Sequence, residues 1–250
     1  MVQLMEEMTW REVRDAAAEG LPVVLPVGST EQHGPHLPLN TDCVIPQAIA
    51  LAAGEHYPLV VAPPIRHGAK SRPLSGGGEG FPGTLSLRAT TLLALLEDVV
   101  AGLARAGFAK VCVLNWHYEN APFLWEACEA VSQRHPDTRF LVLDQPLPEI
   151  APEDIDAIFG GDFQGWEVEH AALAETSMML AARPDLVRTE LIADDRSERR
   201  PGWETLPPSP DTIPASGVLW KASGSNEAAG RRLIELAAER LRSALTAEFG

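Results

Sequence analysis

The chain has 250 residues, of which 45% are apolar and 22% are charged, a balance that fits one large α/β domain over residues 1–250. Its formal net charge of −15 argues against nucleic acid or an anionic membrane surface as a partner. No apolar stretch approaches the ~18 residues of a membrane-spanning helix, and the N-terminal segment lacks the layout of a signal peptide.

Short apolar runs alternate with helical patterns along the chain. Four runs are continuous in Val, Leu and Ile, as in strands buried on both faces of a parallel sheet: 21–28, 59–63, 110–115 and 139–144. Five segments have helical periodicity: 43–54, 88–106, 120–134, 166–182 and about 223–247, the last with Ser223 as its expected N-cap. This alternation predicts an α/β fold with a mainly parallel central sheet and right-handed crossovers.

Two long segments interrupt the alternation, 64–86 and 190–222, and both are rich in Gly, Pro and charge. Loops of this length in a compact domain are usually functional or contact a partner, and we expect 190–222 to make subunit contacts. The glycine run at 75–84 lacks the GK[ST] ending of a phosphate-binding loop. It is expected either to bring Ser75 or backbone amides to a small ligand or to be a plain flexible turn.

Cysteine usage bears on the cellular compartment. Cys43, Cys112 and Cys128 are odd in number and show no CxxC spacing, so neither a disulfide framework nor a zinc knuckle is indicated. A reducing, cytoplasmic location is therefore expected. Cys112 lies within the run 110–115 and is expected to be a small core side chain.

Polar side chains follow two of the predicted strands, where parallel-sheet enzymes build their sites. Glu31 and His33 come after the run 21–28, and His117 and Glu119 come after the run 110–115. A spacing of two in an extended segment points both side chains to the same side, and Asp42 adds a further carboxylate. Two imidazoles and three carboxylates suit one or two divalent ions such as Zn²⁺ or Mn²⁺. Together they predict a metal centre that activates water for hydrolysis.

The other histidines have different interpretations. A lone Glu-x-His pair in a polar loop is usually solvated, and the second pair is what favours a metal site. His36 is either a third ligand or a hydrogen-bonding partner behind the ligands. For His56, His67 and His135 no carboxylate lies at a suggestive spacing, so we expect structural or surface roles.

The segment 165–180 carries a further polar group within an apolar helical pattern. On a helix Trp166, Glu169, His170 and Leu173 would share one face, and burying the carboxyl and imidazole there without a purpose is costly. We therefore expect this face to line a pocket, with His170 as a general acid or base. An ion-paired core histidine is the alternative.

A resemblance to the creatininase family of metal-dependent amidohydrolases rests on four segments in order: "LPVGSTEQHGPHLPLNTD", "KSRPLSGGGEGFPGTLSL", "NWHYENAPF" and "GWEVEHAALAETSMMLAARPDLV". The resemblance covers the chain to about residue 190 and implies a three-layer α/β/α fold, two divalent ions per chain, Zn²⁺ and/or Mn²⁺, and frequent assembly into homohexamers. It implies that Glu31 and His117 bind one ion, that His33 and Glu119 bind the other, and that Asp42 bridges them.

The same resemblance implies roles around the ions. Four residues match positions that contact the substrate: Ser75, Tyr118, Trp166 and Glu169. His170 matches the proton-transfer histidine, so the implied catalytic residues are His170 and the ligand Glu119. The small-molecule substrate expected first is a cyclic amide, with creatinine opened to creatine.

Two departures from the creatinine branch bear on the substrate. Pro146 stands about where that branch has a gating tryptophan, and Trp116 replaces a glycine before His117. Other branches of the family open a cyclic inosose ketone, deformylate a pyrimidine precursor or cut a peptide in cofactor maturation, and these substrates stay open. A non-catalytic metal-binding or ligand-sensing protein and a zinc-dependent isomerase or lyase are rivals from other classes. His170 argues against the non-catalytic rival, because a structural metal site needs no proton shuttle.

Overall fold

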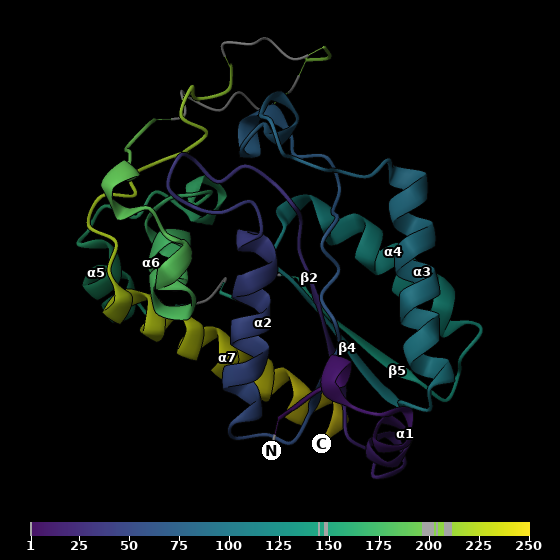
Figure 1. Cartoon of the computed structure of the whole chain (residues 1–250). Helices are drawn as coiled ribbons and strands as arrows, with labels where there is room; N and C mark the ends of the chain where they lie inside the picture. Colours follow the sequence, from purple (N-terminus) through teal and green to yellow (C-terminus); the bar gives the residue numbers. More distant parts are fainter. Residues whose placement is uncertain (1, 145, 148–149, 197–202, 204, 208–211) are drawn as a thin grey trace.

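A parallel five-stranded sheet forms the centre of the fold (Figure 1). The structure is a computed structural model that describes residues 2–144, 146–147, 150–196, 203, 205–207 and 212–250. The strand order is β1-β3-β2-β4-β5, and every neighbouring pair is parallel. The strands are β1 (Gln3–Leu4), β2 (Val23–Val27), β3 (Val60–Val61), β4 (Lys110–Asn115) and β5 (Arg139–Leu143). The predicted parallel sheet is therefore confirmed, with β1 as an additional edge strand.

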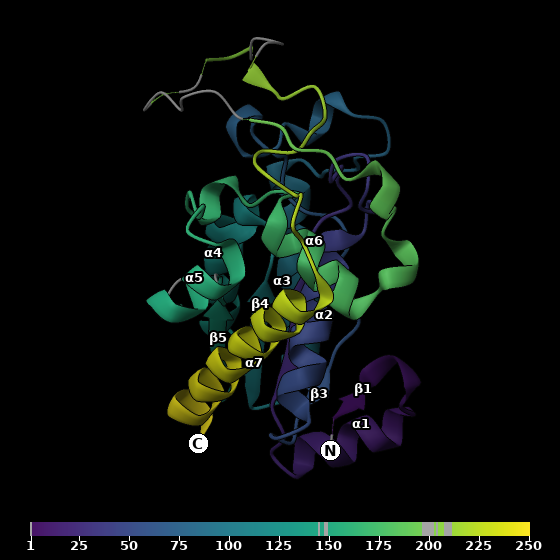
Figure 2. The same cartoon turned by 90° about the vertical axis from the view of Figure 1, so that its left-hand side faces the viewer.

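Helices cover both faces of the sheet, which confirms the three-layer α/β/α architecture (Figures 1 and 2). One layer contains α2 (Thr41–Gly54), α5 (Pro152–Phe159), α6 (Leu173–Ala182) and α7 (Glu227–Phe249). The other layer contains α1 (Trp10–Ala18), α3 (Ala89–Arg105) and α4 (Ala121–Ser132). None of the described helices has both the length and the apolar character needed to cross a membrane.

The alternation of side chains along each strand creates two separate cores. On β2 and β4, Val24 and Leu114 pack into the core under α2, α6 and α7. Their neighbours Val23 and Val113 point the opposite way, into the core under α3 and α4. All four side chains have no solvent exposure, and burying a Val or Leu side chain contributes about 1.5–3 kcal/mol. This explains why the strand sequences are continuously apolar.

The helix expected at 166–182 is wrong in its first half. A 3-10 turn covers Trp166–Val168, and α6 begins only at Leu173. Between them Ala171 has a φ of 53°, the left-handed region, which ends any continuous α-helix. Side-chain carboxylates replace the missing helical acceptors, since Glu169 accepts from the backbone N–H of Ala174 and Glu175 accepts from that of Ala171.

The start of the last helix also differs from the prediction. Asn226, not Ser223, is the N-cap of α7, and its side-chain oxygen accepts from the N–H of Ala229 at 3.0 Å. Ser223 is instead tied to the carboxylate of Asp194, which accepts from its backbone N–H at 2.7 Å. Two helices, α1 and α5, were not predicted, although Thr9 and Glu12 form a capping box before α1.

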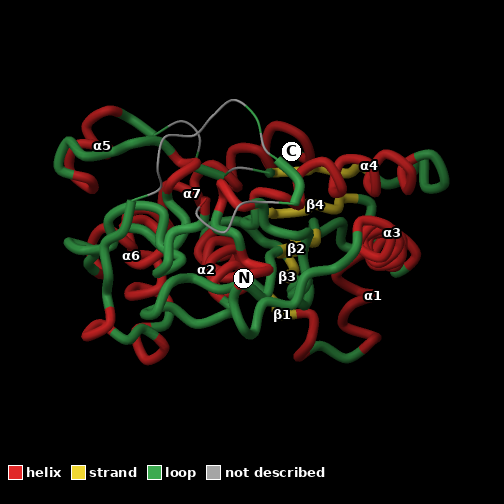
Figure 3. Tube along the Cα trace, turned by 90° about the horizontal axis from the view of Figure 1, so that it is seen from above, coloured by secondary structure: helices red, strands yellow, loops and turns green. Residues whose placement is uncertain are grey.

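The loops that follow the strands gather above the sheet in Figure 1, and Figure 3 looks down on them. The loop 28–40 leads from β2 into α2, and Trp116 and His117 lead from β4 into a 3-10 turn, Tyr118–Asn120. The segment 64–86 crosses the same end with two short 3-10 turns, Pro73–Ser75 and Gly78–Gly80. The functional candidates therefore lie at the carboxyl ends of the strands, as expected for a parallel sheet.

Candidate metal centre and active site

The loop after β2 brings a carboxylate, an imidazole and the first turn of α2 together. Glu31 is anchored by its backbone N–H, which donates to the carbonyl of Leu39 at 2.9 Å. Asp42 lies in the first turn of α2, and its backbone passes directly over Gly28. A Cβ at Gly28 would lie 2.1 Å from the carbonyl oxygen of Asp42, so only glycine permits this close approach.

Two histidines converge on the carboxylate of Asp42. Nδ1 of His117 lies 3.1 Å from Oδ2 of Asp42 and 3.1 Å from Oε2 of Glu31. Nε2 of His33 lies 3.0 Å from the other oxygen, Oδ1 of Asp42. All four side chains are buried. Asp42 therefore presents one oxygen to each imidazole.

Backbone carbonyls fix the orientation of both rings. Nδ1 of His33 donates to the carbonyl of Glu31 at 3.1 Å, and Nε2 of His117 donates to that of Ala69 at 3.0 Å. In each neutral ring the nitrogen that faces Asp42 then carries a lone pair. A lone pair opposite a carboxylate oxygen is stabilised by a cation between them, either a proton or a metal ion. The donor set fits divalent ions such as Zn²⁺ or Mn²⁺, for which histidine ligands are held in this way by their second nitrogen.

The electrostatic field of the centre also favours a cation at this position. Burial alone would lower the pKa of His33, but Asp42, Glu175 and Glu31 outweigh it and raise this pKa to about 10. Burial likewise disfavours a charge on His117, yet hydrogen bonds and attraction from Asp42 and Glu31 raise its pKa well above the usual value. The carboxylates thus strongly favour positive charge at both imidazoles.

Glu119 lies beside this group but faces the glycine-rich segment. Its Oε1 accepts from the backbone N–H of Arg72 at 3.2 Å and from the hydroxyl of Ser75. Its Oε2 lies 3.5 Å from Nε2 of His117, the nitrogen that donates to Ala69. Glu119 is thus placed next to His117, and none of its contacts among the described residues reaches His33.

The glycine-rich segment supports the carboxylates of the centre rather than forming a phosphate loop. Ser71 donates its hydroxyl to Oε1 of Glu31. At Gly78 a Cβ would lie 2.7 Å from the same oxygen, so the backbone passes close to Glu31. At Gly76 a Cβ would lie 2.8 Å from Nε2 of His170. Glycines therefore let this segment cover the site closely.

A cavity of about 560 Å³ opens in front of the centre. The expected substrate-contacting residues all line it: Ser75, Tyr118, Trp166 and Glu169. His170 and Glu119 line it as well. Trp116 and Pro146, the two departures from the creatinine branch, also belong to its wall, together with Asp144 and Glu175. Tyr118 is 54% exposed, so it stands at the mouth.

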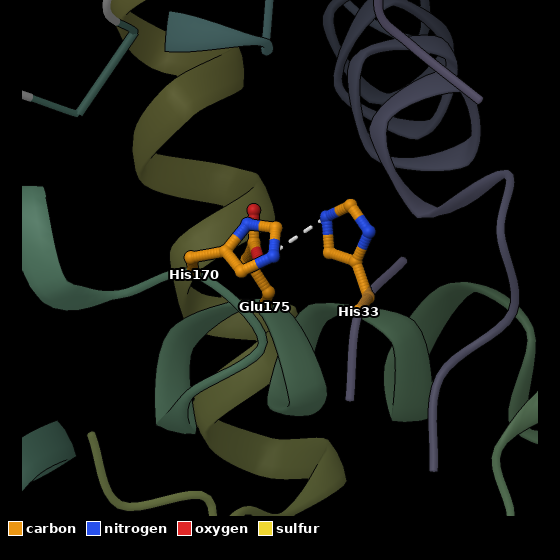
Figure 4. Close-up of side chains that lie close together, drawn as sticks. All are labelled: His33, His170 and Glu175. Carbon is orange, nitrogen blue, oxygen red and sulfur yellow. Dashed lines mark ion pairs between the residues drawn. The ribbon is translucent and has the colours of Figure 1, made fainter. Parts of the chain in front are cut away.

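His170 lies against His33, with ring centroids 4.4 Å apart and planes tilted by 38° (Figure 4). The amide of Gln32 faces Nε2 of His170 at 2.9 Å. Because Oε1 of Gln32 accepts from the N–H of Gly34 at 2.9 Å, it is the amide nitrogen that faces His170, and this nitrogen also donates to the carbonyls of Gly76 and Gly217 at 3.0 Å each. An amide nitrogen cannot accept a hydrogen bond, so Nε2 of His170 carries its lone pair on this side. Burial and the neighbouring His33 lower the pKa of His170 to about 4, which keeps it neutral near pH 7.

Two carboxyls at the start of α6 form the wall beside His170. Oε2 of Glu169 accepts from the N–H of Ala174 at 2.8 Å, whereas its buried Oε1 has no partner among the described residues. Burial raises the pKa of Glu169 to about 8. Glu175 accepts from the indole N–H of Trp116 at 2.9 Å and from the N–H of Ala171 at 2.6 Å. Burial raises its pKa to about 7.

Four polar residues of this site were missed from the sequence: Gln32, Asn115, Asp144 and Glu175. Gln32 lies between two expected ligands, but the alternation of an extended segment points it away from them, so the spacing gave no signal for it. Asn115 donates to the carbonyl of His117 at 2.7 Å and to Asp144 at 2.8 Å. Glu175 had no comparable signal, because its place depends on where α6 begins.

The remaining histidines lie outside the two described ligand groups, Glu31–Asp42–His117 and His33–His170–Glu175. Nε2 of the buried His36 is 2.8 Å from the hydroxyl of Thr176, which places this residue behind the site. Burial, followed by the charge of His33, lowers its pKa to about 4. His67 contacts the carbonyl of Leu85, and His56 is exposed.

Comparisons with known proteins agree with this geometry. The family model described as "Creatininase: Creatinine amidohydrolase" matches residues 6–245. The chain is 33% identical to the creatinine amidohydrolase of Pseudomonas putida over 249 residues, 97% of this chain and 96% of that protein. It is 36% identical to the mycofactocin precursor peptide peptidase of Mycolicibacterium smegmatis over 174 residues, 67% of this chain and 60% of the relative. A 3-dehydro-scyllo-inosose hydrolase from Thermotoga maritima matches over 45% of this chain at 30% identity.

Solved structures extend the similarity to three dimensions. A crystal structure of creatinine amidohydrolase superposes with a TM-score of 0.94 at 33% identity, covering 98% of this chain and 97% of that chain. Similar creatininase structures include a Zn–Zn form and a Mn form, with TM-scores of 0.93 and 0.94. A further one is complexed with creatine.

Proposed function

The chain belongs to the creatininase family and is a hydrolase, and from this premise we propose that it holds two divalent ions and opens a small cyclic amide, with creatinine as the leading substrate. The observation that carries the proposal is the placement of Asp42 between two imidazoles. Each of its oxygens faces a nitrogen whose opposite ring position is tied to a backbone carbonyl. One carboxylate shared in this way suits a bridge between two ions.

The proposed ligands follow the geometry and the family resemblance. Glu31, Asp42 and His117 offer donor atoms that lie within 4.8 Å of one another, which suits one ion. His33 and the second oxygen of Asp42 would hold the other ion, and the resemblance assigns Glu119 to it. Nitrogen and carboxylate oxygen donors suit Zn²⁺ or Mn²⁺. When bound, such ions lower the pKa of water and polarise a carbonyl group.

The side chains around the ions would bind the substrate and move the proton. His170 is neutral with Nε2 as an acceptor, so it can take up a proton released from water and pass it to the leaving nitrogen. Trp166 and Tyr118 offer aromatic surface to a flat ring. Oε1 of Glu169 has no partner among the described residues and can form a hydrogen bond with the substrate, and Ser75 adds a hydroxyl to the wall.

A second candidate substrate class is favoured by the cavity wall. Pro146 lines the cavity at the point where the creatinine branch is expected to carry a gating tryptophan, and Trp116 adds an indole to the wall. The similar proteins include a mycofactocin precursor peptide peptidase and a 3-dehydro-scyllo-inosose hydrolase. A hydrolase of such a substrate, with the same ions and the same His170, is the alternative proposal.

The test is a turnover screen of the protein after loading with Zn²⁺ or Mn²⁺, using creatinine, inososes, formamides and a mycofactocin precursor peptide. We expect creatinine to be opened to creatine, with the matched His170→Ala protein as the inactive control. Turnover of another substrate without creatinine turnover would move the assignment to the second class. Absence of turnover with every substrate, at two bound ions per chain, would overturn the hydrolase assignment of this site.

We propose in addition that the protein acts in the cytoplasm as a homo-oligomer, with the hexamer expected from the resemblance. Light scattering at several protein concentrations measures the assembly directly. A monomer at all concentrations would contradict this part of the proposal.

A further inference from the structure

Glu175 faces the metal-binding side of His33, and neither the family resemblance nor the comparisons assign it a role. Oε2 of Glu175 lies 3.6 Å from Nε2 of His33, and Figure 4 shows the two side chains converging from α6 and from the loop after β2. Nδ1 of His33 already donates to the carbonyl of Glu31, so Nε2 is the nitrogen available to a metal ion. Glu175 thus approaches this imidazole at its ligand atom.

The separations match those between two ligands of one ion. Two donors that are each about 2.0–2.1 Å from a tetrahedral Zn²⁺ lie about 3.3 Å apart. The distance from Nε2 of His33 is 3.0 Å to Asp42 and 3.6 Å to Glu175, on either side of that value. By contrast, the contacts of Glu119 run to Arg72, Ser75 and the proton-bearing nitrogen of His117.

The carboxylate of Glu175 is held in place from two directions. The N–H of Ala171 donates to Oε2 at 2.6 Å, and the indole N–H of Trp116 donates to Oε1 at 2.9 Å. Ala171 is fully buried with a φ of 53°, a conformation that costs about 1–2 kcal/mol outside glycine. Each carboxylate oxygen retains a further lone pair after these bonds. The loop of His117 and the turn of His170 are therefore joined through the oriented carboxyl group of Glu175.

His170, the third member of the same group, is less suited to bind an ion. Its Nε2 faces the amide nitrogen of Gln32, whose orientation is set by the N–H of Gly34 and by the carbonyls of Gly76 and Gly217. In the neutral ring the proton then lies on Nδ1, so the single lone pair of the ring points at this amide group. Both neighbours of His33 in Figure 4 carry a possible ligand atom, but Nε2 of His170 faces Gln32, whereas Oε2 of Glu175 lies 3.6 Å from Nε2 of His33.

We propose that Glu175 is a further carboxylate of the metal centre, acting on the ion bound at His33 and Asp42, with Trp116 as the residue that orients it. The inference rests on the proposed binuclear centre. It adds a ligand to that centre and gives Trp116 a role besides that of cavity wall.

The test is a titration of the metal-depleted protein with Mn²⁺ by electron paramagnetic resonance and with Zn²⁺ in competition with a chromophoric chelator. Glu175→Gln is compared with wild type and with Glu169→Gln as the matched control. Both carboxyls are buried and both accept a backbone N–H at the start of α6, but only Glu175 approaches His33. We expect Glu175→Gln to weaken the affinity for one of the two ions by about 10- to 100-fold. Glu169→Gln should leave the affinity for both ions unchanged.

Trp116→Phe supplies an independent variant, because it keeps the ring and removes the N–H that donates to Glu175. We expect Trp116→Phe to weaken the affinity for the same ion by a few-fold. If Glu175→Gln does not fold, this variant tests whether Glu175 acts on that ion. Wild-type affinity for both ions in Glu175→Gln, equal weakening in Glu169→Gln, or unchanged affinity in Trp116→Phe would each overturn the inference. Fewer than two ions in the wild type would overturn the binuclear proposal itself, whereas two ions without creatinine turnover would affect only the substrate assignment.

Discussion

Asp42 and His117 face each other at the centre of the site, with Oδ2 of the carboxylate 3.1 Å from Nδ1 of the imidazole. The other oxygen of Asp42 lies 3.0 Å from Nε2 of His33, so a single side chain contacts both imidazoles. This arrangement depends on Gly28, which allows the first turn of α2 to sit over the end of β2. Asp42 is therefore the residue of this group that contacts both histidines, and the proposed metal chemistry depends on it most.

Asp42→Asn is expected to reduce the metal content from two ions to fewer than one per chain. The amide has a similar shape, but it loses the charge and places an NH₂ group against one of the two histidines. Asp144→Asn is the matched control, because Asp144 lines the same cavity but lies outside both described ligand groups. Elemental analysis after gel filtration measures the ions. Two ions in Asp42→Asn would contradict the bridging role.

His170→Ala is expected to retain both ions while the turnover rate falls by about 10²- to 10⁴-fold, the usual contribution of a proton-transfer group. The basis is the position of His170 against His33 with Nε2 as an acceptor. His56→Ala, at an exposed histidine, is the control for the loss of an imidazole. The rate is measured on whichever substrate the screen identifies. A rate within about threefold of wild type would remove His170 from the mechanism.

Glu169→Gln is expected to change how stability depends on pH. Burial raises the pKa of Glu169 from 4.5 to about 8, so the folded state keeps a proton that the unfolded state releases. Between these two values the folded protein binds more protons, and its free energy of unfolding must fall as pH rises. The free energy of unfolding of Glu169→Gln should therefore exceed that of wild type by an amount that grows from pH ~5 to ~8. This difference should reach at most about 5 kcal/mol. Urea unfolding at several pH values, with equal metal loading, measures this, and a constant difference would contradict it.

Gly230→Ala is expected to destabilise the protein by about 2 kcal/mol or more, because α7 packs against α6 at this glycine. A Cβ there would lie 1.8 Å from the carbonyl oxygen of Ser177. Gly102→Ala is the matched control on α3, where the nearest atom is the end of Arg105 at 3.8 Å. That change should stabilise by roughly 0.5–1 kcal/mol through helix propensity. Chemical denaturation of both variants checks the pair, and equal effects would contradict the packing argument.

The candidate metal centre could be predicted where the spacing of residues along the chain determines which way their side chains point. Glu31 with His33, and His117 with Glu119, are pairs at a spacing of two, directly after strands whose apolar runs are visible in the sequence. Parallel strands end at one edge of the sheet, which predicts the same edge for both pairs, and the pairing of β2 with β4 makes them neighbours. The helix at 166–182 was wrong because its interruption at Ala171 is maintained by side-chain hydrogen bonds that no periodicity reveals.

By itself the sequence determined the layer architecture, the edge of the sheet that carries the site, and the residue types that a metal centre needs. These features follow from short-range rules, the period of side chains along a strand and the polarity of the loops that follow it. Only the tertiary structure decided which nitrogen of each histidine faces Asp42, and that Glu175 and Gln32 belong to the site. Those contacts join residues far apart in the chain, Trp116 with Glu175 at a separation of 59 and Gln32 with His170 at a separation of 138. They form only when packed helices and loops bring buried polar groups to the partners that burial requires.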